Sequence, residues 1–197
     1  MTVRILLVDD HDLVRRGVRV VLEGENDLSV VAEAASVEEA RRVAIPVDVA
    51  VMDVRLCDGN GVELSRWLSA NRPLAARVLL TSLDEDRAIL AALLAGASGC
   101  VLKQVKGLDL ISVVREAASG ESSIGGTEID VALSRQRAII ERASVVAGCD
   151  ENAMAVLRLL GMGLADKEIA RELGVDPSTV DAFVRAMVTE IGLGPLR

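Results

Sequence analysis

Aromatic residues are almost absent from this chain of 197 residues, which has one Trp, one Phe and no Tyr. Hydrophobic residues nonetheless make up 51% of the sequence, so a sizeable core must be built from Val, Leu, Ile and Ala. These residues are typical of a parallel sheet that helices cover on both faces. The composition therefore favours an α/β fold.

Cysteine and histidine are nearly as scarce. The three cysteines, Cys57, Cys100 and Cys149, are too far apart for a C-x-x-C metal pair and odd in number for a disulfide framework. This usage favours a reducing compartment. His11 is the single histidine, which excludes sites built from several imidazoles, and we interpret it as a loop or helix-start residue.

Basic residues are outnumbered, and long apolar runs are missing. Lys and Arg total 22 against 30 Asp and Glu, a formal net charge of −8, so any contact with DNA must come from a local basic patch. The sequence has neither a signal peptide nor a run of about 18 apolar residues. We therefore expect a cytoplasmic protein without membrane attachment.

Short apolar runs alternate with segments of helical spacing over the first 120 residues. The strand-like runs are Val3–Val8, Leu28–Glu33, Val47–Met52, Arg77–Leu80 and Gly99–Leu102. The helical segments are Asp12–Leu22, Val37–Val43, Gly61–Ala70, Glu85–Ala95 and Leu108–Ala118. Five β–α repeats predict a doubly wound, five-stranded parallel sheet of the flavodoxin-like kind, because right-handed crossovers place helices on both faces.

Residues 121–148 are predicted to form a largely helical linker. The segment Gly120–Gly126 is typical of a hinge, and Thr127 would cap a helix that runs to about Val146. An apolar stripe with 4-3-4-3 spacing follows it, made of Ile129, Leu133, Gln136, Ile140 and Ala143. Such a stripe fits packing against the chain's own domains or a short dimer seam.

Polar side chains gather where the predicted strands end. Asp9 and Asp10 end the first strand, Asp53 the third and Thr81 the fourth, and Lys103 follows the fifth. In an open parallel sheet these ends form the ligand site. Several carboxylates in one cleft need a hard divalent ion such as Mg²⁺, beside which a carboxylate can attack phosphorus and form an acyl phosphate. Lys103 would neutralise the transferred group, and the Thr81 hydroxyl would hydrogen-bond its oxygens.

The segments that carry these residues resemble the receiver domain of two-component response regulators over residues 1–120. They read VDDH at 8–11, MDVRLCDGNG at 52–61, LLTS at 79–82 and GASGCVLK at 96–103. The resemblance implies that Asp53 accepts phosphate from the phosphohistidine of a sensor histidine kinase. It also implies a Mg²⁺ site formed by Asp9, Asp10, Asp53 and the backbone carbonyl of Arg55, with Thr81 and Lys103 contacting the phosphoryl group.

Two positions depart from the family pattern. Cys100 stands at the switch position, where receivers usually carry a Tyr or Phe whose ring turns inward as the Thr81 position moves. A thiol cannot act through the same steric effect, so we expect phosphorylation to couple differently to output. Cys57 replaces a common Pro. We interpret both cysteines as small packing residues rather than redox sites.

Residues 149–197 have the pattern of a small all-α helix-turn-helix domain. Apolar positions mark three helices, at Ala153, Val156, Leu157 and Leu160, at Leu164, Ile169, Ala170 and Leu173, and at Val180, Val184, Met187 and Ile191. Asp150 would cap the first helix, Gly174 would form the turn, and Asp176-Pro177 would begin the third helix. A short helix, a turn and a longer helix are the order expected of a helix-turn-helix.

The segment GLADKEIARELGVDPSTVDAF at 163–183 is similar to the DNA-binding domain of NarL/LuxR-type regulators. With the receiver, the chain resembles NarL/FixJ-family transcriptional regulators. The resemblance implies a homodimer that contacts DNA through Lys167, Ser178, Thr179 and Arg185. The family's last helix has no counterpart before residue 197, so we expect a truncated or atypical output domain.

The charges of this domain depart from the family. Asp181 and Glu190 stand where the family usually has Lys, and residues 150–197 hold five basic side chains against eight acidic ones. Acidic side chains repel the phosphates that supply most nonspecific affinity. Two hypotheses follow: a phosphorylation-controlled transcription factor, or an adaptor whose helix-turn-helix binds a protein. Neither implies an enzyme with turnover beyond self-catalysed phosphotransfer.

Overall fold

The computed structural model describes residues 2–72, 75–103, 107–149 and 151–194. Its main sheet has five parallel strands in the order β2-β1-β3-β6-β7. They are β1 (Val3–Val8), β2 (Leu28–Ala34), β3 (Val49–Asp53), β6 (Ala76–Thr81) and β7 (Gly99–Leu102). All five strands match predicted runs to within two residues. A two-stranded antiparallel hairpin, β4 (Arg55–Leu56) and β5 (Gly59–Asn60), was not predicted.

Alternate residues of the strands build two separate layers of core. Ile5 and Leu7 of β1 face one layer, which α1 (Asp12–Glu23) and α5 (Gly107–Ser119) cover. Leu6 and Val8 face the other layer, which α2 (Val37–Arg42), α3 (Gly61–Asn71) and α4 (Glu85–Ala95) cover. Period-two alternation on a sheet buried on both faces produces this arrangement, and it confirms the doubly wound α/β prediction.

The C-terminal part of the chain is helical. It contains α6 (Gly126–Arg135), α7 (Arg137–Ala147), α8 (Ala153–Gly161), α9 (Asp166–Leu173) and α10 (Pro177–Glu190). The last three have the predicted helix-turn-helix order, with Gly174 left-handed at φ 66° and Asp176 accepting the Ser178 N–H. Asp150, the predicted cap of α8, lies outside the described residues.

The single linker helix predicted from Thr127 to Val146 was wrong. The chain forms two helices that meet at Gln136, and the first begins after Gly125, whose N–H donates to Glu128 at 3.0 Å. The two helices separate because they pack on different elements: α6 lies on α4, and α7 lies on α10. Leu133, Ile140 and Ala143 of the apolar stripe are buried in this packing, so the stripe serves the chain's own core.

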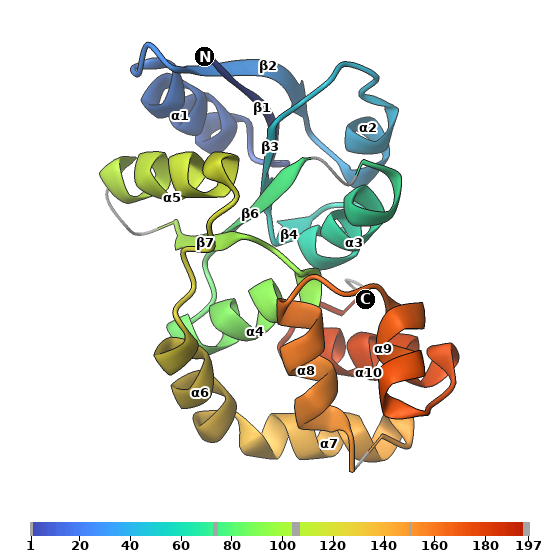
Figure 1. Ribbon diagram of the computed structural model, residues 1–197. Helices are drawn as coiled ribbons and strands as arrows, with labels where there is room; N and C mark the ends of the chain where they lie inside the picture. Colours follow the sequence, from blue (N-terminus) through green and yellow to red (C-terminus); the bar gives the residue numbers. More distant parts are fainter. Residues whose placement is uncertain (1, 73–74, 104–106, 150, 195–197) are drawn as a thin grey trace.

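Helix α4 is the element that joins the two parts. Ala88 and every residue from Leu90 to Ala95 are buried, so the helix is apolar on all sides after its charged first turn. Figure 1 shows α4 enclosed between the sheet and the C-terminal helices. It packs on α3 and β7 on one side and on α6 and α8 on the other. A helix that is hydrophobic all round must be covered all round, and here the output helices cover its outer face.

The contact between α4 and α8 is close, and polar contacts of α3 lie beside it. A Cβ atom at Gly161 of α8 would lie 2.4 Å from Leu93 Cδ2 of α4, so any larger residue would force the Leu93 side chain to move. Beside it, the Arg66 guanidinium of α3 pairs with Asp166 of α9 and donates to the Leu94 carbonyl at 3.2 Å. Receiver and output helices therefore share one continuous core.

None of the helices in the described ranges is long and apolar enough to cross a membrane.

Candidate functional site

The pocket lies at the carboxyl ends of β1 and β3, which are neighbours in the sheet. Val8 pairs with Met52 in the register, so the residues that follow them, Asp9 and Asp53, reach the sheet edge at the same level. Thr81 ends β6 on the other side of β3, and the Lys103 N–H donates to the Thr81 carbonyl at 2.7 Å. Topology alone therefore collects residues that are far apart in sequence.

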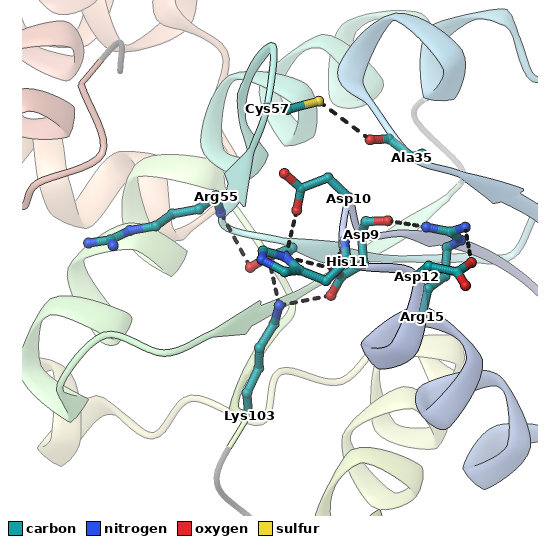
Figure 2. A network of polar contacts seen from close by, with 10 residues as sticks. Asp9, Asp10, His11, Asp12, Arg15, Ala35, Arg55, Cys57 and Lys103 are labelled. Carbon is teal, nitrogen blue, oxygen red and sulfur yellow. Dashed lines mark hydrogen bonds and ion pairs between the residues drawn. The ribbon is translucent and has the colours of Figure 1, made fainter. Parts of the chain in front are cut away.

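Lys103 joins the two buried carboxylates. Its Nζ lies 2.8 Å from Asp9 Oδ2 and 2.7 Å from Asp53 Oδ2. The Asp9 side chain is fully buried and that of Asp53 is 7% exposed, so their charges need a partner inside the protein. Figure 2 shows Lys103, which directly follows β7, extending into this cluster.

Burial and ion pairing have opposite effects on the pKa values of Asp53 and Lys103. Burial raises the pKa of Asp53 above its ordinary value, and the hydrogen bond from Lys103 opposes this only in part. Burial works against the charge of Lys103, yet Asp53 and Asp9 together raise the pKa of that ammonium group. The lysine therefore stays charged, while the aspartate sits in an environment that makes its carboxylate more basic.

Local backbone contacts fix the loop that carries Asp53. The Arg55 N–H donates to Asp53 Oδ1 at 3.3 Å, and the Gly61 N–H donates to the Val54 carbonyl at 2.9 Å. A Cβ at residue 61 would lie 2.4 Å from the Asp53 carbonyl oxygen, so glycine is required there. Asn60 then caps α3 by accepting the Glu63 N–H at 2.9 Å.

The structure brings together Asp9, Asp10, Asp53 and Lys103, as the sequence predicts. Thr81 is buried at the neighbouring strand end, where its Oγ1 accepts the Leu83 N–H at 3.0 Å. The Arg55 side chain points away from the pocket, as Figure 2 shows, and its guanidinium lies 3.5 Å from the Gly192 carbonyl. Its position leaves only the backbone of Arg55 near the pocket.

Two residues beside the pocket, His11 and Arg15, were not predicted to belong to it. His11 Nδ1 lies 2.8 Å from Asp10 Oδ1 and 3.5 Å from Asp9 Oδ1, so the imidazole belongs to the acidic cluster. Arg15 donates to the Asp9 carbonyl at 2.7 Å and pairs with Glu33, which holds the loop after β1 against β2. The position of His11 directly after two aspartates was the available signal.

The donor set fits a hard divalent ion. One ligand atom from each of Asp9, Asp10, His11 and Asp53 lies within 4.8 Å of all the others. Asp10 Oδ1 is buried, and within the described part of the chain its one polar neighbour is the His11 imidazole, whose Nδ1 lies 2.8 Å away. Carboxylate oxygens at this spacing are the ligands that Mg²⁺ prefers.

A cavity of about 210 Å³ lies beside Cys100. Apolar side chains form much of its wall, among them Ile89, Val113 and Ile124. An aromatic side chain at residue 100 would enter this space, and cysteine leaves it open. Burial raises the pKa of the Cys100 thiol to about 12, so the thiolate is scarce at neutral pH and packing remains the better interpretation of this residue.

We expect a thiol reagent at pH 8 to label Cys57 first and Cys100 slowly. Cys57 is exposed, whereas only about one Cys100 thiol in ten thousand is ionised four pH units below its pKa. Kinetics of labelling with a chromogenic disulfide, compared between the native chain and Cys57→Ser, would measure this. Equal rates at both positions would contradict the burial of Cys100.

The residues proposed to contact DNA lie on α9 and α10 beside acidic partners. Arg185 pairs with Asp181 one turn earlier at 2.5 Å, and the Ser178 hydroxyl donates to Asp176 at 2.5 Å. Lys167 and Asp181 line the same cavity of about 400 Å³, which also touches Arg66 of the receiver. Thr179 is half-buried. The basic groups therefore do not form an unopposed patch.

Comparisons with known proteins agree with this architecture. The response regulator receiver domain family matches residues 5–115. The chain is 39% identical over 193 residues to the DNA-binding transcriptional activator DevR/DosR of Mycobacterium tuberculosis, covering 97% of this chain and 89% of that protein. It is 31% identical to the response regulator protein VraR of Staphylococcus aureus, covering 97% and 91%.

Solved structures show the same fold. A LuxR-family two-component response regulator from Aurantimonas sp. SI85-9A1 superposes with a TM-score of 0.62 at 32% identity, over 70% of this chain and 99% of that one. The response regulator ChrA of a heme-sensing two-component system covers 98% of this chain and 91% of its own, with a TM-score of 0.55 at 28% identity.

A receiver fold with an acidic pocket and a lysine at the fifth strand end defines a response regulator. The chain belongs to this family, and its full-length similarity to DevR/DosR and VraR identifies it as a response regulator of the NarL/FixJ type.

Proposed function

We propose that this chain is a two-component transcription factor in which phosphorylation of Asp53 by a sensor histidine kinase controls binding to DNA. The observation that carries the proposal is the pairing of Lys103 with both Asp9 and Asp53 beside the Asp10 carboxylate. Residues 1–120 would receive the signal, residues 121–148 would transmit it, and residues 149–197 would deliver it.

In the reaction, an Asp53 oxygen attacks the phosphorus of the phosphohistidine, and the imidazole of the kinase leaves as the acyl phosphate forms. Mg²⁺ bound by Asp9, Asp10, Asp53 and the Arg55 carbonyl would supply positive charge that neutralises the phosphoryl oxygens. Lys103 would exchange its contact with Asp53 Oδ2 for a phosphoryl oxygen. Thr81 can accept the Leu83 N–H and donate its own O–H to the same group.

We propose that the chain catalyses this single phosphotransfer to itself and no further turnover. The pocket supplies an acceptor, a cation site and a lysine. The phosphorylated protein would bind DNA, in keeping with the name of the DNA-binding relative DevR/DosR, and we propose that it does so as a homodimer.

The first experiment is a titration of the full-length protein against genomic DNA fragments at low salt, with and without a small acyl-phosphate donor and Mg²⁺. Tighter, sequence-specific binding after phosphorylation is the expected result, together with a dimer in sedimentation. If Asp53 is phosphorylated and no fragment binds in either state, the DNA-binding part of the proposal is wrong.

The second candidate is a signalling adaptor that binds a protein through α10. The exposed face of α10 carries Ser178, Asp181, Arg185 and Thr189, and Asp181 already neutralises the one basic side chain among them. Glu190 at the end of the helix pairs with Arg142 of α7 at 2.7 Å. A face with this charge balance favours a protein partner over phosphates.

Asp181→Lys tests which candidate applies. The change removes a repulsive charge and frees Arg185, so affinity for DNA should rise at least tenfold at low salt. The plot of log affinity against log salt concentration should also become steeper, by the amount expected for about one to two additional phosphate contacts. Glu121→Lys makes the same change of net charge on an exposed residue outside α10 and serves as the control. Fluorescence anisotropy at several salt concentrations measures both. Equal gains in the two variants would show a general charge effect and favour the adaptor.

A further inference from the structure

The cavity beside Cys100 lies between the receiver and the linker. Ile89 of α4, Cys100 of β7 and Val113 of α5 form its receiver side. Ser123 and Ile124 of the linker close its other side. None of the described lining residues belongs to the acidic pocket. A molecule held in this space would therefore contact both parts of the chain at a place separate from Asp53.

The linker side of the cavity is held by contacts of its own. The Ser123 N–H donates to the Ser98 carbonyl at 3.0 Å, which fastens the linker to the edge strand β7. Gly99 leaves room for this contact, since a Cβ there would lie 2.5 Å from Val113 Cγ1 and 2.6 Å from Ser123 Oγ and would force both side chains to move. Ile124 is half-buried and packs against the core that contains α4. The cavity is therefore a preformed space, as most small-molecule sites are.

The charged side chains among the described lining residues are all acidic. They are Glu85, Asp109 and Glu128, and each is exposed, whereas the apolar lining residues are buried or half-buried. The arginines of α4 and α6, Arg87 and Arg135, pair with other carboxylates. The three rim carboxylates thus have no basic partner within the described ranges, and the opening of the cavity is negatively charged.

The size of the cavity suits one ring. An apolar cavity of about 150 Å³ can hold a benzene-sized molecule, and this one measures about 210 Å³, which leaves room for a short substituent. Burial raises the pKa of the Cys100 thiol to about 12, so the thiol adds no charge at neutral pH. A neutral apolar space with carboxylates at its opening fits a molecule that has an apolar ring and a cationic end.

We propose that the cavity binds a small amine that carries an aromatic ring. The ring enters the space beside Cys100, and the ammonium group lies at the opening among the three rim carboxylates. Ring burial supplies the affinity, and the negative opening attracts a cation and repels an anion. Because the ligand contacts Ile124 as well as α4 and α5, it holds the linker against the receiver.

The test titrates the full chain with benzylamine, and with benzyl alcohol and benzoate as probes that have the same ring and a different charge. Chemical shifts of the Ile89, Val113 and Ile124 methyl groups report binding at the cavity itself. We expect benzylamine to bind with a dissociation constant of about 1–10 mM, which is ordinary for about eight non-hydrogen atoms. Benzoate should bind at least tenfold more weakly, with benzyl alcohol between the two.

Two variants and a control locate the site. Cys100→Phe fills the cavity and should abolish the benzylamine shifts at Ile124. Glu128→Gln removes one rim charge but keeps an oxygen for the Gly125 N–H, which Glu128 accepts at 3.0 Å. This variant should bind benzylamine about twofold to fivefold more weakly and benzyl alcohol unchanged. Glu121→Gln removes the same charge from an exposed residue outside the cavity and should change neither affinity.

Three results would overturn the proposal. If benzylamine does not shift the cavity methyl groups, or binds Cys100→Phe as well as the native chain, the cavity is not its site. If benzyl alcohol or benzoate binds as tightly as benzylamine, the cationic class of ligand is wrong. If Cys100→Phe does not fold, equal affinities of Glu128→Gln and Glu121→Gln for benzylamine contradict the role of the opening. None of these measurements involves phosphorylation, so their failure would leave the function proposed above unaffected.

Discussion

Asp53→Asn is expected to abolish phosphoryl acceptance and, at neutral pH, to make the folded protein more stable. The amide cannot attack phosphorus, so an acyl-phosphate donor with Mg²⁺ should add no mass to the variant. The same change removes a buried charge, since burial dominates the raised pKa of Asp53. Loss of function and gain of stability should therefore appear together.

The sign of the pH dependence follows from that pKa. In the unfolded chain Asp53 ionises near its ordinary value of 3.8, and in the folded protein it ionises at a higher pH. Folding therefore takes up a proton between the two values, and stability falls as the pH rises through this window. Each pH unit of displacement corresponds to about 1.4 kcal/mol. The gain from Asp53→Asn should be full at pH 7 and vanish below pH 4, as measured by thermal unfolding.

Asp58→Asn is the matched control, because its pKa is displaced the other way. Burial opposes the charge of Asp58, yet the N–H groups of Val37 and Glu38, which donate to it at 2.8 and 3.0 Å, lower its pKa overall. The native carboxylate therefore stabilises the fold above the unfolded pKa, and the effect is lost as the pH falls through the folded value. Asp58→Asn should destabilise at pH 7. The same sign for both variants would contradict the burial of charge at Asp53.

Gly161→Leu is expected to separate the output helices from α4. The Cβ alone would lie 2.4 Å from Leu93 Cδ2, and the rest of a leucine would extend into a core where Leu93 is 3% exposed. Overpacking of this kind costs about 1–3 kcal/mol, and the chain can avoid the cost by opening the contact between α4 and α8. A larger radius of gyration in small-angle scattering and faster proteolysis near residues 121–125 should follow.

Gly17→Leu is the control for this variant. Gly17 also lies within a helix, α1, but a Cβ there would meet nothing within 4 Å. Leucine is the better helix former, so this change should raise the melting temperature slightly and leave the radius of gyration unchanged. A compact Gly161→Leu protein with native protease resistance would show that the close approach of α4 and α8 is not needed.

The sequence predicts the receiver half of the molecule well, because period-two runs and helical spacing are local signals. It predicts the carboxylates and Lys103 because the ends of parallel strands must meet at one edge. It does not predict the break at Gln136, which arises because α6 and α7 pack on different elements far away in the chain. His11 was interpreted as a loop or helix-start residue, and it is the N-cap of α1, but its contact with Asp10 was not predicted.

The apolar sequence of α4 also indicates that both faces of this helix are covered, which was not predicted. Residues 88–95 read AILAALLA, with no polar side chain to face water. A helix on the outside of a sheet normally keeps one polar side, so a helix without one indicates a second covering layer. The packing of α6 and α8 on α4 supplies that layer.

Because the output helices cover α4, the receiver cannot simply be separated from them or joined to another output domain. Many signalling proteins are chains of interchangeable modules, and a receiver cut away from its output part usually keeps a water-compatible exterior. Here a receiver ending near residue 120 would expose the outer side of Leu93 and its neighbours, which the output helices now bury. Such a fragment would associate with other molecules through that surface. Fusion of this receiver to a foreign output domain would therefore require polar replacements on α4.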